Sequence, residues 1–393
     1  MTTENNYNID IAIFGAGIAG LWTFHRLRKL GYNAVLFEKN SIGHGQTIAS
    51  QGIIHSGLKF SLVGKVNKLA QNISKMPDIW RNALQGEGDV DLSTATANAT
   101  SQHLLIPPGF MGGLTALVAQ KALGKHVRTI PEKQWPDNLK QSGFRGNTIF
   151  MGEPVLDIPS VLRALAEPYR KNIYKITEQQ AQNPLHFLEE NRITARKIIF
   201  TGAADNKTIA EQNQHNKGLE TQKRPLMQGM IKNAPFPLWA HLVGKTDKPV
   251  ASITSHYTEN KELIWYLGGG VAERAKESNP ADVHHAMISA LNTYMPNIQT
   301  DNLEWSTLPI DRVEGKSKTD SWMPDIPTIH DAGDVLYCWP TKLTFSPMLS
   351  DMIISKLQDS NISPSQTQSD IASLPKAEYA KTPWDTAQWK KQS

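Results

Sequence analysis

Cysteine is almost absent from this sequence of 393 residues. The one cysteine, Cys338, excludes an intramolecular disulfide and any zinc or iron–sulfur site that several cysteines would build. We therefore expect no metal site. The scarcity of cysteine fits a reducing compartment, so we expect a cytoplasmic protein.

Long apolar runs and blocks of one charge are also missing. No run approaches the roughly 18 residues that a membrane-spanning helix needs, and the polar N-terminus lacks the apolar region of a signal peptide. Lysine and arginine number 41 against 37 acidic residues, a net charge of +4 without a basic block. We expect a small-molecule substrate, no nucleic acid and no transmembrane segment, whereas a protein partner or an oligomer stays open.

A glycine motif near the N-terminus is the most informative stretch. An apolar run, 9–14, predicts a buried parallel strand and leads into Gly15, Gly17 and Gly20, a complete G-x-G-x-x-G. Residues 21–30 repeat apolar side chains at helical spacing. In such a motif the first glycine permits a tight turn, the second lets a pyrophosphate approach the backbone, and the third lets the helix pack on the sheet. Phosphates then bind at the helix N-terminus.

The strand that follows this helix ends in an acid. Residues 34–37 are apolar and Glu38 closes them, which completes a βαβ unit of about 30 residues. A carboxylate there can accept hydrogen bonds from an adenosine ribose. Strand, glycines, helix, strand and acid in this order predict dinucleotide binding, because a plain glycine-rich turn does not account for Glu38.

The small, polar segment 41–57 distinguishes between dinucleotides. A nicotinamide domain usually continues into another helix at this point. A flavin protein needs a segment that runs back along the pyrophosphate and ribitol, and side chains such as Thr47, Ser50 and Gln51 suit that role.

The rest of the chain alternates between two kinds of pattern. Residues 66–84 and 114–123 predict helices, 193–202 predict a parallel strand that ends in small residues, and 223–271 read as consecutive antiparallel strands. After residue 358 the chain is rich in Ser, Gln and Lys and is expected to be poorly ordered, apart from Trp384 and Trp389, which can dock.

Three stretches resemble the FAD-dependent oxidoreductases of the D-amino-acid oxidase superfamily, which includes glycine and sarcosine oxidases, glycerol-3-phosphate dehydrogenases and L-2-hydroxyglutarate dehydrogenases. They are the βαβ unit, the segment from Gly45 to Ile-His-Ser-Gly at 54–57, and the strand, turn and helix of 334–357. Lys-Leu-Thr at 342–344 is similar to the glycerol-phosphate branch. Where the family has a glycine-rich turn, this chain has Trp-Pro-Thr-Lys at 339–342.

The resemblance implies a fold, domain boundaries and a cofactor. We expect an α/β fold, with a Rossmann-like FAD-binding domain and an interleaved antiparallel-sheet substrate domain (α+β), and non-covalent FAD. The expected segments are 1–100 and 151–222 for the FAD-binding domain, 101–150 and 223–311 for the substrate domain, 312–360 for the FAD-binding C-terminal return, and 361–393 for a polar tail. The predicted cofactor-binding residues are Gly15, Gly17, Ile18, Ala19, Gly20, Glu38, Lys39, Gln46, Thr47, Ser50, Gln51, Gly52, Ile176, Thr201, Gly202, Thr341, Lys342, Leu343 and Thr344.

The implied reaction removes a hydride from a carbon that bears an amine or a hydroxyl. An alcohol needs a base, for which His55 is the candidate, although it can equally be a structural histidine beside the flavin. Arg312 matches a substrate-binding arginine of the family, and Lys342 would place a positive charge at the flavin. The further substrate-binding candidates are Lys59, His256 and Tyr266.

Two other functions remain open at this point. One is a flavoprotein subunit or scaffold with little activity alone, which the tryptophan-containing tail, 376–393, and the loss of the turn glycines permit. The other is an NAD-dependent dehydrogenase.

Overall fold

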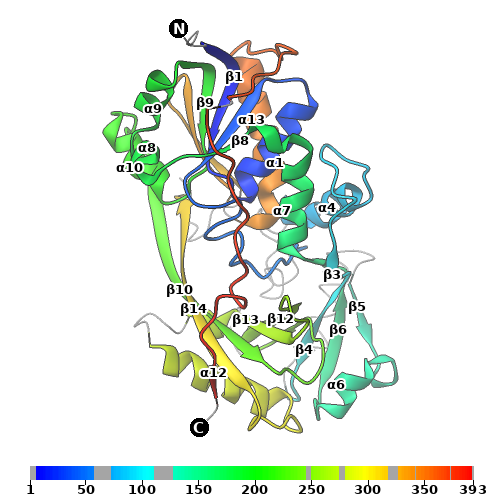
Figure 1. Ribbon diagram of the computed structural model, residues 1–393. Helices are drawn as coiled ribbons and strands as arrows, with labels where there is room; N and C mark the ends of the chain where they lie inside the picture. The colour runs from blue at the N-terminus through cyan, green and yellow to red at the C-terminus, as the bar shows by residue number, and fades with distance from the viewer. Residues whose placement is uncertain are drawn as a thin grey trace.

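The computed structural model describes residues 6–56, 72–109, 127–244, 249–273, 279–316, 326–340, 342–371 and 373–391. Two large sheets organise these residues, one of six strands and one of nine. In Figure 1 the six-stranded sheet and its helices form the upper part of the molecule and the nine-stranded sheet forms the lower part. The chain enters each sheet more than once, which confirms the expected combination of a parallel sheet with an interleaved antiparallel one.

The six-stranded sheet has the order β15-β16-β9-β1-β2-β8 and is parallel apart from the hairpin of β15 and β16. Successive side chains of β1 point to opposite faces of the sheet, so both faces are apolar. Ile11 and Ile13 face one layer of helices, whereas Ala12 and Phe14 face the other. Its strands are β1 (Tyr7–Phe14), β2 (Ala34–Glu38), β8 (Ile173–Lys175), β9 (Ile193–Phe200), β15 (Thr328–Asp331) and β16 (Val335–Trp339).

Helices cover both faces of this sheet. On one face, the buried residues of three helices share a core with the sheet, and on the other face two short helices do so, which Figure 1 shows on the left. The first group is α1 (Ile18–Lys29), α7 (Ile158–Ala166) and α13 (Ser346–Asp359), and the second is α9 (Pro184–Glu190) and α10 (Asp205–Gln212), with α8 (Glu178–Gln182) before them.

The nine-stranded sheet has the order β17-β14-β10-β13-β12-β11-β4-β6-β5. Its two longest strands, β10 (Thr221–Lys232) and β14 (Glu304–Gly315), pair along their whole length and reach up toward the first sheet in Figure 1. Helix α12 (Pro280–Tyr294) packs on the face opposite the first sheet and shares a core with its strands. The other strands are β4 (Gln102–Ile106), β5 (Val127–Ile130), β6 (Asn147–Met151), β11 (Ala240–Leu242), β12 (Ala251–Tyr257), β13 (Leu263–Gly268) and β17 (Lys390–Lys391).

Short elements connect the two sheets. β3 (Ala97–Ala99) and β7 (Val155–Leu156) form a two-stranded sheet. Helix α4 (Met76–Leu84) lies within the first expected helix, whose earlier residues 66–71 are outside the described part of the chain, as is the whole expected helix 114–123. The remaining elements are α6 (Asp137–Gln141), α11 (Gly270–Glu273), η2 (Glu132–Gln134), η3 (Glu167–Asn172) and η4 (Leu343–Phe345).

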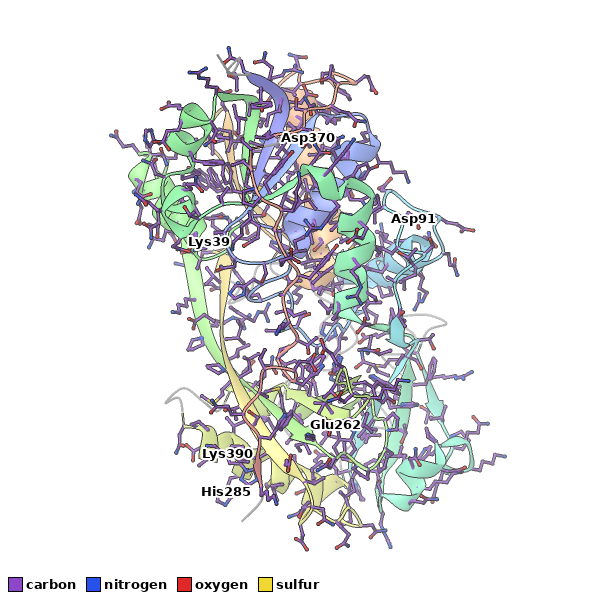
Figure 2. The ribbon with its side chains drawn as sticks, in the orientation of Figure 1. Lys39, Asp91, Glu262, His285, Asp370 and Lys390 are labelled. Atoms are coloured by element: carbon purple, nitrogen blue, oxygen red, sulfur yellow. The ribbon has the colours of Figure 1, made fainter. Side chains whose placement is uncertain are left out.

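The expectation of a poorly ordered tail was wrong. From residue 361 the chain runs down the length of the molecule, with Asp370 near the upper end and Lys390 near the lower end (Figures 1 and 2). Ile371 and Trp384 are buried at separate points along this path, and β17 pairs with β14. The apolar residues of the tail are few and join three separate core clusters, so no periodic pattern indicated its structure.

Candidate active site

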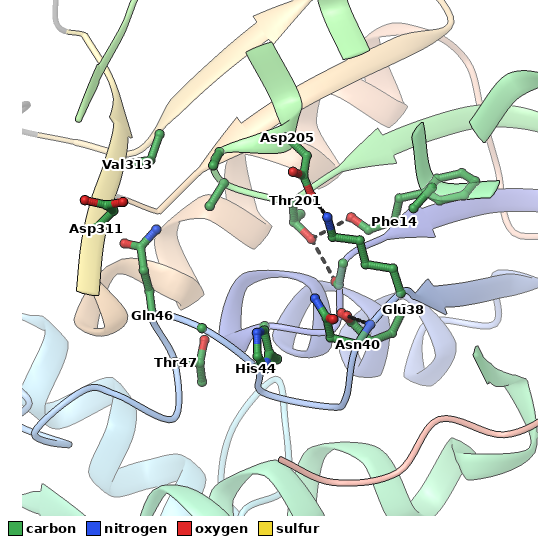
Figure 3. Close-up of a pocket in the computed structure, with 18 of the residues that line it drawn as sticks. Phe14, Glu38, Asn40, His44, Gln46, Thr47, Thr201, Asp205, Asp311 and Val313 are labelled. Atoms are coloured by element: carbon green, nitrogen blue, oxygen red, sulfur yellow. Dashed lines mark hydrogen bonds and ion pairs between the residues drawn. The ribbon is translucent and has the colours of Figure 1, made fainter. Parts of the chain in front are cut away.

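A cavity of about 680 Å³ opens where the strands of the six-stranded sheet end. Its walls come from the turn after β1, the end of β2, the polar segment 44–47, the residues after β9, and the facing parts of β10 and β14 (Figure 3). The carboxyl ends of parallel strands are the usual ligand site of such sheets, and the volume falls within the range of cofactor sites.

The glycine motif has the geometry that the sequence analysis assigned to it. Gly15 has a φ of +106°, which favours glycine. A Cβ on Gly20 would lie 1.9 Å from the carbonyl oxygen of Gly15, so only glycine allows α1 to begin this close to the turn. Gly17 lines the cavity as the N-cap of α1 and has no side-chain cap, so the positive end of the helix faces the cavity.

Glu38 is buried at the edge of the cavity. Its two carboxylate oxygens accept hydrogen bonds from the backbone N–H groups of Ala16 and Asn40, both at 2.6 Å. Burial raises the pKa of this carboxyl above its ordinary value, and the two N–H donors oppose that shift. Each carboxylate oxygen has a second lone pair, so a ribose hydroxyl can still be accepted.

Two threonines join the cavity walls to the glycine turn. Thr47 Oγ1 accepts a hydrogen bond from the N–H of Ile18 at 3.0 Å and so ties the polar segment to the start of α1. Thr201 Oγ1 lies 2.9 Å from the carbonyl oxygen of Gly15, to which it donates. Lys39 forms ion pairs with Glu178 and Asp205 at 2.9 and 3.0 Å, the second of which is visible in Figure 3.

The cavity brings together only part of the predicted cofactor set. The predicted residues that line it are Gly15, Gly17, Glu38, Lys39, Gln46, Thr47, Ile176, Thr201 and Gly202. The predicted residues that do not line it are Ile18, Ala19, Gly20, Ser50, Gln51, Gly52, Lys342, Leu343 and Thr344, and Thr341 lies outside the described residues.

Sequence reasoning missed the wall that β10 and β14 contribute. Asp311 and Val313 line the cavity, whereas Arg312 and Glu314 alternate with them and are not among the lining residues. The period of two along β14 was a readable signal, but nothing in the sequence showed that these strands reach back to the first sheet.

Arg312 belongs to a charged cluster on β10 and β14. Glu314, which is 1% exposed, accepts from Arg312 at 2.6 Å and from Arg224 at 2.8 Å. Burial opposes ionisation of Glu314, but the charges of Arg312 and Arg224 outweigh it and lower its pKa. Lys342 also acts on Glu314 electrostatically, so the structure brings both predicted cations, Arg312 and Lys342, to one place.

His55 belongs to a second polar cluster. Its Nδ1 lies 3.4 Å from Oε2 of Glu153, and its ring centroid lies 6.0 Å from that of His241. Each of these three side chains offers one nitrogen or oxygen atom that could bind a proton or a metal ion, and these atoms all lie within 4.8 Å of one another. Burial alone would raise the pKa of Glu153, but His55, His241 and Ser56 lower it to about 2. Sequence analysis did not find Glu153 or His241.

Two other predicted residues, Gln51 and Tyr266, form hydrogen bonds between the polar segment and the nine-stranded sheet. Gln51 Nε2 donates to the carbonyl oxygens of Ser252 and Tyr266 at 2.8 and 2.9 Å. The buried Tyr266 donates from its hydroxyl to the carbonyl of Ala49 at 2.8 Å. The polar segment is thereby held against the nine-stranded sheet, and Tyr266 has the contacts of a structural residue.

His256 is covered by the tail. Its ring stacks on Trp384 with centroids 4.5 Å apart, and burial lowers its pKa to about 3. Its role as a substrate ligand stays a prediction, as does that of Lys59, which lies outside the described residues. Cys338 is buried in β16, where burial raises the pKa of its thiol.

The return segment before α13 meets the loop that contains His55. The N–H of His55 donates to Thr344 Oγ1 at 3.3 Å, and Trp80 Nε1 donates to the carbonyl of Thr344 at 3.0 Å. Leu343 and Thr344 belong to η4, directly before α13. This segment therefore adjoins the histidine cluster, and its proposed contact with the cofactor stays a prediction.

The doubly covered parallel sheet, the glycine turn and the cavity at the strand ends define a dinucleotide-binding oxidoreductase fold with a second, antiparallel domain. A family model described as FAD dependent oxidoreductase (DAO) matches residues 10–325. The chain belongs to this family, so its cofactor is FAD, as the sequence predicted. The N-terminus of α1 at the cavity wall, the acceptor Glu38 and the cavity fit the ADP half of that cofactor.

Similar proteins agree with this assignment. A probable FAD-dependent oxidoreductase of Pseudomonas aeruginosa is 33% identical over 389 residues, which cover 96% of this chain and 98% of that protein. A crystal structure of an FAD-dependent oxidoreductase from the same organism superposes with a TM-score of 0.80 at 28% identity, covering 97% and 98% of the two chains.

More distant structures share the fold alone. Glycine oxidase from Geobacillus kaustophilus has a TM-score of 0.59 at 12% identity, with 92% of this chain and 100% of that one covered. L-α-glycerophosphate oxidase from Mycoplasma pneumoniae, a structure with FAD bound, has a TM-score of 0.58 at 14% identity, with 89% and 95% covered. Across the described ranges, no helix has the length and apolar character to cross a membrane.

Proposed function

We propose that the protein oxidises a small anionic amino acid or 2-hydroxy acid at the carbon that bears the amine or hydroxyl. The cluster around Glu314 supports an anionic substrate. Three cations, Arg224, Arg312 and Lys342, act on the buried carboxylate of Glu314, so positive charge is gathered at this place. A guanidinium binds a carboxylate through two parallel hydrogen bonds.

Each residue has a defined task in this proposal. The side chain of Arg312 is 28% exposed, which leaves part of it accessible to a substrate carboxylate. His55 would accept the proton of a hydroxyl, whereas an amine need only arrive in its neutral form. Bound FAD supplies the acceptor for the hydride. Gly15, Gly17, Glu38 and Thr47 would hold its ADP half in the cavity.

The alternative of a partner-binding subunit loses one of its two supports. That interpretation relied on the loss of the turn glycines and on the tryptophans of the tail being available to another protein. Trp384 instead is buried and donates from Nε1 to the carbonyl of Tyr257 at 3.1 Å. A folded tail that contacts its own chain favours a self-contained enzyme.

The test mixes the anaerobic yellow protein with glycine, sarcosine, D- and L-amino acids, 2-hydroxy acids and glycerol 3-phosphate. We expect at least one carboxylate substrate to bleach the flavin absorbance. For that substrate, Arg312→Ala should raise the KM at least tenfold and keep FAD bound, because losing a charged hydrogen bond costs about 1.5–3 kcal/mol. Lys316→Ala is the control, since Lys316 is an exposed cation just beyond the same strand.

Two results would oppose the proposal. Bleaching by no member of the panel would exclude these substrate classes. Unchanged kinetics of Arg312→Ala would remove Arg312 from the substrate site.

A further inference from the structure

The cluster of His55, Glu153 and His241 comes from three separate parts of the chain. His55 lies in the loop after Gly52, Glu153 follows β6, and His241 lies in β11. Glu153 and His241 are each 1% exposed. The side chain of His55 is 16% exposed, so it is the most accessible member of the cluster.

Glu153 is anchored by neutral donors. Its Oε1 accepts from the N–H of Ser56 at 2.7 Å and from Ser56 Oγ at 2.6 Å. Its Oε2 accepts from Gln102 Nε2 at 3.3 Å and faces His55 Nδ1 at 3.4 Å. The N–H of Ser56 and the amide of Gln102 donate, so each carboxylate oxygen of Glu153 is held as an acceptor, including the one that faces His55.

The orientation of Glu153 selects one tautomer of His55. A carboxylate oxygen opposite Nδ1 favours a proton on Nδ1, and the lone pair of a neutral imidazole then lies on Nε2. A carboxylate in this position also stabilises the imidazolium that forms when Nε2 takes a proton. Among the described residues, His241 is a second titratable group at the cluster, and its Nδ1 lies 2.6 Å from Ser252 Oγ.

We propose that Glu153 is a positioning residue that holds His55 as a general base for a hydroxyl group, so that the substrate is a hydroxy acid. This inference rests on the proposed function and narrows it. A neutral amine can be oxidised without a base, whereas an alcohol loses its O–H proton during oxidation. The O–H bond would break with its proton passing to His55 Nε2, and bound FAD would supply the acceptor for the hydride of the carbon.

The first test observes the tautomer directly in the complete, FAD-loaded protein. We label the 12 histidines with ¹⁵N, and use His55→Asn to identify the signals of His55 by NMR. The expected result is a protonated Nδ1 and an unprotonated Nε2. Glu153→Gln should reverse this pattern, because its amide would present N–H donors to Nδ1. Protonation on Nε2 in the wild-type protein would overturn the proposal, even if Glu153→Gln does not fold.

The second test is kinetic and uses the hydroxy acid that bleaches the flavin fastest. Glu153→Gln should slow flavin reduction by about 10²–10⁴-fold, the usual contribution of a general base, with little change in the dissociation constant of the substrate. The double variant with His55→Asn should be no slower than His55→Asn alone, because Glu153 acts through His55. Glu190→Gln is the matched control, since Glu190 contacts His186 at 3.0 Å on the surface of α9.

Three results would contradict the proposal. Losses that multiply in the double variant would mean that Glu153 acts independently of His55. A stoichiometric divalent cation in the purified protein, released by Glu153→Gln, would show that the cluster binds metal instead. Bleaching by amino acids and by no hydroxy acid would refute the substrate class. Bleaching by neither class would refute the proposed function, and the tautomer measurement would still decide the role of Glu153.

Discussion

Two glycines of the same motif should fail in different ways when each is replaced by alanine. A Cβ on Gly20 would lie 1.9 Å from the carbonyl oxygen of Gly15, whereas a Cβ on Gly17 would meet only Thr47 Oγ1, at 3.1 Å. The first substitution strains the packing of the protein itself. The second fits the protein with a small shift of one hydroxyl but places a methyl group at the wall of the cofactor cavity.

The distances set the expected magnitudes. An ordinary carbon–oxygen contact is about 3.3 Å, so Gly20→Ala must move the turn and α1 apart by roughly 1.4 Å. Overpacking of this kind costs about 1–3 kcal/mol, which for a chain of this length lowers the Tm of the apoprotein by about 1–4 °C. For Gly17→Ala we expect a nearly unchanged Tm and the loss of about one charged hydrogen bond to the pyrophosphate, roughly a 10–100-fold weaker FAD affinity.

The assay has two parts, measured on both variants and on wild type. Thermal unfolding of the apoprotein reports the strain, and titration with FAD, followed by flavin fluorescence, reports the affinity. Wild-type FAD affinity in Gly17→Ala would refute the placement of the pyrophosphate at the start of α1. An apoprotein of Gly20→Ala as stable as wild type would refute the close packing of this turn.

Two further predictions concern the tail and pH. Trp384→Ala should lower the free energy of unfolding by about 3–5 kcal/mol, which corresponds to a Tm lower by about 4–6 °C. It should also raise the pKa of His256 from about 3 toward its ordinary value, since the stacked ring of Trp384 covers His256. An unchanged Tm would mean that the tail does not dock. In the wild-type protein the depressed pKa of His256 means that the unfolded chain binds a proton first, so the free energy of unfolding should fall by up to about 1.4 kcal/mol per pH unit as pH drops from about 6.5 toward 3. His256→Gln should flatten that region of the curve, and an identical slope in the variant would exclude His256 as its source.

The parts that the sequence predicted are those encoded within one short stretch. The turn at Gly15, the start of α1 and the carboxylate of Glu38 lie within one βαβ unit, so spacing alone indicated their arrangement. The family, the fold class and the cofactor followed from this stretch and from the resemblance, and all three are confirmed.

Contacts between distant segments could not be read in the same way. Glu153 lies 97 positions from Ser56, its hydrogen-bond partner, and no local pattern marks such a pair. The cavity wall on β14 depends on how far a long strand extends beyond its own sheet. The docking of Trp384 was expected, but the rest of the tail was wrongly expected to be poorly ordered because composition measures average polarity, whereas single residues such as Ile371 are buried.

The strand order of the six-stranded sheet has a consequence for biosynthesis. β1 pairs with β2 on one side and with β9 on the other, and β9 begins at Ile193, 179 positions after the end of β1 at Phe14. At about 5–20 residues per second, β1 would wait roughly 10–40 s on the ribosome for that neighbour. The apolar strand that begins the cofactor site is therefore made well before its neighbour β9 and must stay protected from aggregation until that strand has emerged.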